Sequence, residues 1–122
     1  MPTPAVDRDA LVALLDANPN LIITIIDSFL EDCVDYMAAI RDAVEEEKAE
    51  VLKREAHGLK GAAGSLRAEP ASEAARALEE MGRSGDFQEA DSALATLEHE
   101  MDRLKDELRA LREECREELT DD

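Results

Sequence analysis

The sequence predicts an all-α fold: an antiparallel four-helix bundle with an additional N-terminal helix and long second and last helices. Three observations predict it. Ala, Leu, Glu and Arg dominate the composition, and these residues favour helices. Aromatic residues make up only 2%, with five Gly and four Pro, which argues against a β-sandwich or barrel. Apolar residues also recur at steps of three and four along most of the chain.

A chain of 122 residues is expected to form one domain spanning residues 1–122. The four-helix bundle would occupy about 19–119, after a lid helix at about 4–16. Thr3 is a residue type that caps helices, and Pro4 suits the first helical position. Asn18-Pro19 then predicts a break before the second helix.

Three amphipathic segments follow the break, at about 19–47, 49–67 and 71–83. Ser84-Gly85-Asp86 is expected to close the last of these, with Gly85 as a left-handed cap. The predicted core positions of the third helix are Leu52, Ala56, Leu59, Ala63 and Leu66. Those of the fourth are Ala71, Ala75, Leu78 and Met81.

The fifth helix, at about 87–119, has an apolar seam with a sustained 3.5-residue period. Its members are Ala90, Leu94, Leu97, Met101, Leu104, Leu108, Leu111 and Cys115. One interpretation is a monomer in which this seam faces the second helix and the two long helices form a protruding hairpin. The alternative is a parallel coiled-coil homodimer, which the charge pairs Glu100 with Lys105 and Glu107 with Arg112 would favour. We expect the monomer.

A net charge of −17 argues against binding to nucleic acid or to anionic membranes. The sequence holds no apolar stretch long enough to span a bilayer, and its first residues do not resemble a signal peptide, so we expect a cytoplasmic protein. Cys33 and Cys115 lie at apolar helical positions and are expected to be buried, reduced thiols. Neither they nor the histidines have metal-ligand spacing, so no metal site and no cofactor are expected.

The third helix contains Gly58, Gly61 and Gly64, although each glycine costs a helix interior up to about 1 kcal/mol relative to Ala. On a helical wheel, Lys53, His57, Lys60, Gly61 and Gly64 share one face, away from the core positions. Two glycines on that face leave room for another molecule to approach the imidazole. The glycine pattern therefore indicates an accessible histidine.

The segment from Lys53 to Arg67 carries a net charge of +3 with His57 neutral, within a strongly acidic chain. A neutral, exposed imidazole is a good nucleophile, and the ammonium of Lys60 can offset charge on phosphoryl oxygens. The pattern therefore favours a phosphoryl acceptor. His99, which lies off the apolar seam, is expected to be an ordinary solvated residue.

The run His57-Gly58-Leu59-Lys60-Gly61, followed by small residues, resembles the phosphorylation motif of histidine phosphotransfer (HPt) domains. The resemblance extends over about 7–97. It implies that His57 is phosphorylated, with Lys60 stabilising phosphoryl charge and Gly61 allowing partner access. It also implies receiver domains of hybrid histidine kinases or response regulators as partners, and we assign Lys53, Gly64 and Arg67 to partner docking.

The chain departs from the family at Arg67, where many members have Gly, and this departure is expected to alter the helix–helix turn or the docking surface. Mg²⁺ would belong to the partner receiver. The chain lacks a Gly-x-x-x-x-Gly-Lys-Ser/Thr loop, so no ATP-dependent kinase activity of its own is expected. The alternative function is a non-catalytic helical adaptor or coiled-coil homodimer, which would leave the three glycines unexplained.

Overall fold

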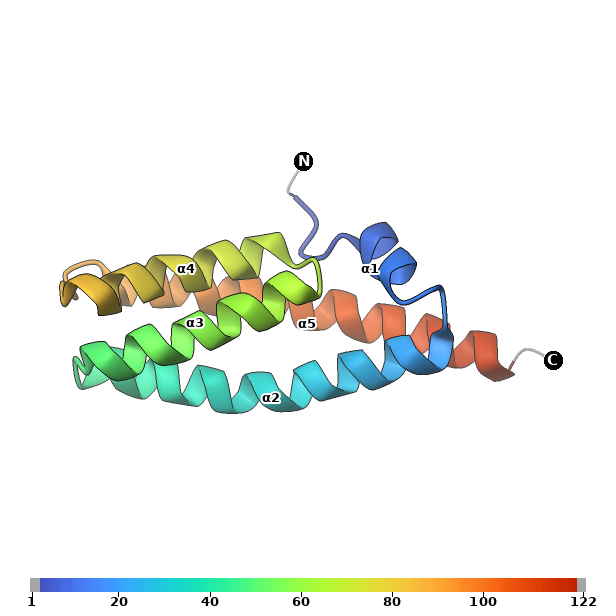
Figure 1. The fold of residues 1–122 in the computed structure, drawn as a ribbon, viewed down its shortest axis with the longest axis horizontal. Helices are drawn as coiled ribbons and strands as arrows, with labels where there is room; N and C mark the ends of the chain where they lie inside the picture. The colour runs from blue at the N-terminus through green and yellow to red at the C-terminus, as the bar shows by residue number, and fades with distance from the viewer. Residues whose placement is uncertain (1–2, 121–122) are drawn as a thin grey trace.

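The computed structural model describes residues 3–120, and within that range the chain forms five α-helices and no strand (Figure 1). The helices are α1 (Arg8–Leu14), α2 (Pro19–Glu45), α3 (Ala49–Ser65), α4 (Glu69–Ser84) and α5 (Ala90–Thr120). The all-α class and the long second and last helices are confirmed. The outermost residues of the predicted domain, 1, 2, 121 and 122, lie outside the described range.

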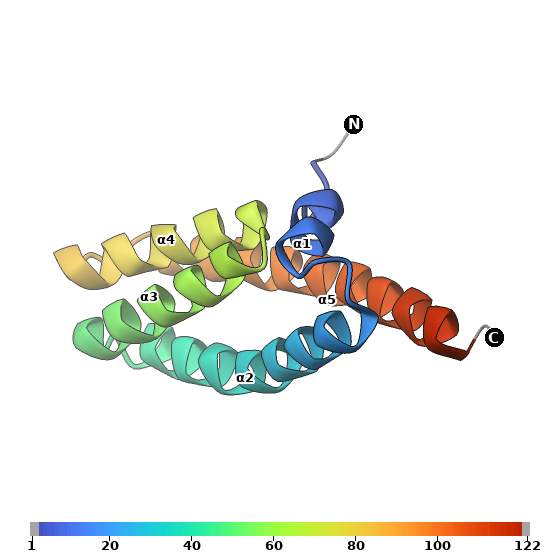
Figure 2. The same ribbon diagram turned by 45° about the vertical axis from the view of Figure 1, so that its right-hand side comes forward.

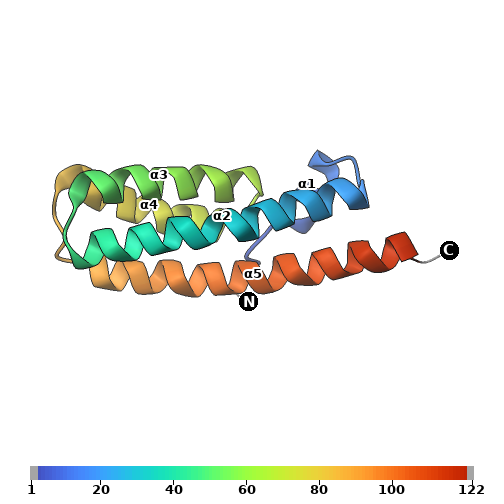
Figure 3. The ribbon, with the colours of Figure 1, turned by 90° about the horizontal axis from the view of Figure 1, so that it is seen from below.

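Helices α2 to α5 form the bundle, with contacts between α2 and α3, α3 and α4, α4 and α5, and α2 and α5. The shorter helices α3 and α4 lie against one half of α2 and α5 (Figures 1 and 3). The other halves of α2 and α5 continue beyond them as a hairpin. The short α1 packs beside this hairpin, turned away from the bundle direction, as Figure 2 shows.

The apolar seam of α5 is buried within the chain. Its buried members are Ala90, Leu97, Met101, Leu104, Leu108, Leu111 and Cys115, and Leu94 is half-buried. Arg112, one of the charged residues that would pair between two copies in a coiled coil, instead contacts Asp27 of α2 at 2.7 Å. This supports the interpretation in which the seam faces α2, because the surface that a coiled-coil dimer would need is already covered.

The predicted start of the first helix is wrong. Helix α1 begins at Arg8, and Asp7 caps it by accepting a hydrogen bond from the Ala10 N–H at 3.1 Å. Residues 3–7, which we call the N-terminal strap, are not helical. Pro4 is therefore not the first helical residue and Thr3 is not the cap.

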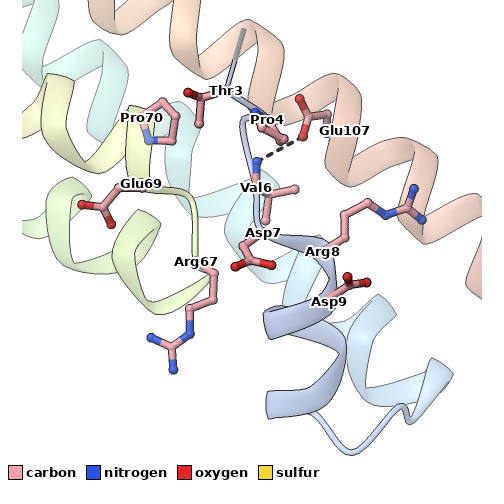
Figure 4. Close-up of a pocket in the computed structure, with 10 residues that line it drawn as sticks. All are labelled: Thr3, Pro4, Val6, Asp7, Arg8, Asp9, Arg67, Glu69, Pro70 and Glu107. Carbon is pink, nitrogen blue, oxygen red and sulfur yellow. Dashed lines mark hydrogen bonds between the residues drawn. The ribbon is translucent and has the colours of Figure 1, made fainter. Parts of the chain in front are cut away.

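The physical reason lies on α5 (Figure 4). The backbone N–H of Val6 donates to one carboxylate oxygen of Glu107 at 3.1 Å, the dashed line in Figure 4, and the backbone N–H of Ala5 donates to the other at 2.9 Å. Both residues are almost fully buried. These long-range bonds to a charged acceptor hold the strap against α5, and a local helix-capping pattern cannot reveal them.

The remaining helix boundaries differ from the predictions by a few residues. Helix α3 ends at Ser65, two residues early, because the backbone turns at Arg67. Helix α5 begins at Ala90 rather than at residue 87. Gly85 has a φ of +76° and caps α4, as expected.

Cys33 and Cys115 are free, buried thiols on α2 and α5, as the sequence predicts. Burial raises the pKa of both thiols above the ordinary value, which keeps them protonated near neutral pH. No single helix between residues 3 and 120 has the length and apolar character of a membrane span. Only α1 and α2 taken together, with a 114° bend between them, have enough apolar length.

Candidate functional site

His57 projects from the outer face of α3. The opposite face of this helix carries four residues that are fully buried in the core, namely Leu52, Ala56, Leu59 and Ala63. The helical period therefore turns His57 outward, and its side chain is 68% exposed. The sequence-based expectation of an accessible imidazole agrees with this geometry.

One ring nitrogen of His57 is held by a buried carboxylate of α4. The Nδ1 atom lies 2.8 Å from Oε2 of Glu79, whose side chain is only 4% exposed. An ionised carboxylate can only accept a hydrogen bond, so we place the hydrogen on Nδ1. In that tautomer the lone pair of Nε2 is available as a nucleophile.

Three cationic or potentially cationic groups surround the Glu79 carboxylate. The Lys60 Nζ lies 2.7 Å from Oε1 as an ion pair, without the alignment of a full hydrogen bond. An Arg83 nitrogen lies 3.3 Å from Oε2. Lys60 contributes most to holding the pKa of Glu79 below its ordinary value; burial opposes this shift, and His57 adds to it. Glu79 therefore stays ionised although it is buried.

Lys60 lies beside His57, but its ammonium is engaged by another residue rather than free in solvent. Its ammonium contacts Glu79, on the Nδ1 side of the imidazole, and its side chain is 31% exposed. To reach a phosphoryl group on Nε2, Lys60 would have to exchange part of this contact. What the arrangement shows for Lys60 is that its ammonium neutralises the buried carboxylate of Glu79.

The glycines of α3 differ in their surroundings. A Cβ on Gly61 would meet nothing within 4 Å, and a Cβ on Gly64 would make an ordinary 3.5 Å contact with Oγ of Ser72. A Cβ on Gly58 would lie 2.6 Å from the ring of Tyr36. Gly61 thus leaves open surface one turn from His57, whereas Gly58 permits close packing of α2.

The expected docking residues lie at different distances from His57. Lys53 is one turn before it on α3 and contacts Glu50 at 3.6 Å. Arg67 lies ten residues after it, about 15 Å along a helix axis, in the turn to α4. Arg67 adopts a φ of +62°, the left-handed conformation that Gly favours, so the backbone at this position has the conformation that a Gly would take. Its carbonyl accepts a hydrogen bond from the Asp7 N–H at 2.9 Å.

Sequence reasoning missed the roles of Glu79 and Arg83. A signal was present, because Glu79 falls four and eight residues after Ala75 and Ala71 and so continues the apolar stripe of α4. A carboxylate in such a stripe is buried, and a buried carboxylate needs a cationic partner. Arg83 follows one turn later and supplies one of them.

Other candidate chemistry is sparse over residues 3–120. No group of three or more His, Cys, Asp or Glu side chains in that range is arranged to hold a metal ion. His99 lies exposed on α5, as expected. Among the described residues, Glu79 is therefore the one buried charged side chain, and it faces His57.

Comparison with known proteins identifies the family and the fold. The Hpt domain family model matches residues 24–114, three quarters of the chain. Histidine-containing phosphotransfer protein B (HptB) from Pseudomonas aeruginosa PAO1 has a similar structure, with a TM-score of 0.85 and 22% sequence identity. The match covers 93% of this chain and 98% of HptB, and it shows a shared fold. No curated protein sequence matches the chain significantly.

The family match spans both halves of the site, since His57 on α3 and Glu79 on α4 fall within it. The helical order and the exposed histidine on α3 agree with a role in histidine phosphotransfer. The chain belongs to the Hpt domain family.

Proposed function

We propose that this protein is a phosphorelay intermediate that accepts a phosphoryl group on Nε2 of His57 from a receiver-domain aspartate and passes it to another receiver. The observation that carries the proposal is the 68% exposed imidazole whose Nδ1 is bonded to a carboxylate that is 4% exposed. This arrangement presents one defined nitrogen to a partner. It explains why a buried carboxylate is kept beneath an exposed histidine.

The imidazole ring of His57 keeps its Nδ1 proton throughout the transfer step. The Nε2 lone pair attacks phosphorus, and the bond from phosphorus to the aspartyl oxygen breaks with its electron pair returning to the donor carboxylate. The imidazole gains a positive charge when the N–P bond forms. Glu79, which accepts the Nδ1–H bond, stabilises that charge, and the reverse sequence returns the phosphoryl group to a second receiver.

The partner supplies what this chain is not expected to provide. In our proposal the receiver domain brings the aspartate, the acidic residues around it and the divalent metal, and this protein has no ATP-dependent kinase activity of its own. The open surface at Gly61 allows the receiver to approach the ring. Lys60 can offset charge on the phosphoryl oxygens once it shares its contact with Glu79.

The adaptor alternative loses its main support. It drew on the α5 seam, which is buried within the chain, and on charged flanking residues, of which Arg112 pairs with Asp27. An adaptor also has no use for a carboxylate buried against an exposed histidine. Phosphoryl transfer accounts for both features of the site.

The first test is transfer from purified phosphorylated receiver domains to the wild type and to His57→Gln. The wild type should be labelled, with an acid-labile and alkali-stable product, and His57→Gln should show no labelling. His99→Gln is the matched control, since it removes the other histidine of the chain and should be labelled normally. Phosphorus and nitrogen NMR of the product should show attachment at Nε2.

Labelling of His57→Gln would overturn the site assignment. Attachment at Nδ1 would contradict the role given to Glu79. A folded wild type that no receiver from the same cell labels would favour the adaptor.

A further inference from the structure

Helices α3 and α4 approach each other closely at Gly82. A Cβ at this position would lie 2.5 Å from the backbone N of Lys53, 2.8 Å from the backbone O of Ala49 and 2.9 Å from the Lys53 Cα. All three atoms belong to the backbone of α3, so no side-chain rotation can make room. Gly82 is buried, and the spacing of the two helices at this point requires the absence of a side chain.

The same side of α4 carries the carboxylate of the site. Glu79 lies three residues before Gly82 and reaches His57 and Lys60 of α3. Ser72, seven residues before Glu79, also contacts α3, donating from Oγ to the Lys60 carbonyl at 3.0 Å. At all three positions α4 therefore touches α3, and Glu79 has the only long side chain among them.

The reach of Glu79 is limited by this spacing. Its carboxylate extends along the helix interface to Nδ1, and the 2.8 Å contact there is close to an ideal hydrogen-bond length. A wider separation of the helices would lengthen this contact, because the remainder of the side chain is packed at 4% exposure and has little slack.

We propose that Gly82 is a positioning residue for phosphoryl transfer, because its missing side chain sets the α3–α4 spacing that brings Glu79 to His57. The inference rests on the proposed function for its kinetic consequence. Its geometric part concerns only the Glu79–His57 contact and can be measured without any partner.

The experiment is Gly82→Ala. Relieving a 2.5 Å contact to an ordinary one requires α4 to retreat by about 1 Å, which is enough to carry the Glu79–His57 contact beyond hydrogen-bond range. Displacements of that size at a reacting centre cost up to about 100-fold in rate. We expect transfer from a phosphorylated receiver to slow by about tenfold or more. In nitrogen NMR spectra, His57 should change from one Nδ1–H tautomer to a mixture of both.

Ile26→Val is the control for lost stability. Ile26 is fully buried on α2, and shortening it weakens the core without adding volume between α3 and α4. This variant should transfer at the wild-type rate and keep the Nδ1–H tautomer. Wild-type transfer and an unchanged tautomer in folded Gly82→Ala would overturn the proposal, as would equal losses in both variants.

If Gly82→Ala does not fold, Glu79→Asp tests the same requirement for a short distance between the carboxylate and His57. It withdraws the carboxylate by about 1.5 Å, one carbon–carbon bond, and adds no volume. Loss of the single tautomer and slower transfer would support the distance requirement, whereas wild-type behaviour would overturn it. If no receiver labels even the wild type, the proposed function fails, and the tautomer measurement still decides whether Gly82 positions Glu79.

Discussion

At the scale of single residues, the imidazole of His57 and the carboxylate of Glu79 differ most in their exposure to solvent. His57 is open to a partner, and Glu79 is shielded from water while it keeps its charge. Low polarity around a hydrogen bond strengthens it, so the contact orients the ring more firmly than a surface carboxylate would. The cations Lys60 and Arg83 make this burial tolerable.

The lowered pKa of Glu79 has a consequence for stability in acid. A carboxyl whose folded pKa lies below its unfolded value, ordinarily about 4.5, stabilises the fold above that value. This contribution is lost as pH falls from 4.5 through the folded pKa. We expect Glu79→Gln to be less stable than the wild type at neutral pH, where it leaves Lys60 without its anionic partner, and to lose less stability on acidification.

Urea unfolding at a series of pH values between neutrality and acid checks this. Glu50→Gln is the control, since the Glu50 side chain is 85% exposed, and its acid response should follow the wild type. An equally steep acid loss in Glu79→Gln and wild type would show that Glu79 is not a source of the pH dependence.

The exposed histidine of the candidate site was predictable from the sequence, and the residues of α4 that surround it were not. The histidine was evident because the glycines and cations on its helix face lie within one local segment. Glu79 lies 22 residues away on another helix, and its role depends on how α3 and α4 cross, which a single helical wheel does not describe. Gly82 was missed for the same reason, since its neighbours are backbone atoms of α3.

At the scale of the elements, the turns between helices have an unusual composition. Non-glycine residues with positive φ occupy three of the four turns in residues 3–120, namely Asp16 and Ala17, Glu47, and Arg67. Only the turn after α4 uses glycine, at Gly85. Each non-glycine residue in this conformation costs about 1–2 kcal/mol, so replacing one of them by glycine can raise the free energy of unfolding.

Arg67→Gly should therefore stabilise the protein. Glycine adopts a φ of +62° without steric cost, and part of that gain is offset by its greater freedom in the unfolded chain. We expect a net gain of about 0.5–1 kcal/mol in the free energy of unfolding, measured with urea. Arg67→Ala is the matched control, because it removes the side chain and keeps the strained conformation; if it gains as much as Gly, the backbone is not the cause.

Helix identities were predictable because the apolar period of each helix continues over several turns. Helix α5 shows this best, since its seam is buried almost throughout. The start of α1 was not predictable from the same kind of signal. Thr3 and Pro4 form a good local start, but the carboxylate of Glu107, about a hundred positions away, holds the backbone of Ala5 and Val6 in another conformation.

At the scale of the whole molecule, the charge is unevenly placed. The chain has a net charge of −17, yet residues 53–67 around His57 carry a net charge of +3. Acidic surfaces elsewhere repel an acidic partner, whereas on the face around His57 the negative charges of Glu50 and Glu79 are balanced by Lys53 and Lys60, so repulsion is weakest there. The overall field thus favours approach of an acidic partner at the histidine.

The burial of the α5 seam predicts the assembly state. We expect a monomer of 13.4 kDa in light scattering, with the same mass across a tenfold range of concentration. The reason is that the apolar stripe suited to a coiled-coil partner is occupied by α2. A mass twice as large would mean that two copies associate through a different surface.

The strap held by Glu107 also bears on the order in which the molecule folds. Helices α3 and α4 are joined by a short turn and meet through contacts close in sequence, so they can pair early. The bonds from Ala5 and Val6 to Glu107 join positions 102 and 101 residues apart. The Glu107 carboxylate reaches its place beside the strap only after α5 has packed into the bundle. The strap is therefore expected to close last and to release first, so that its contacts govern how fast the native protein opens rather than how fast it forms.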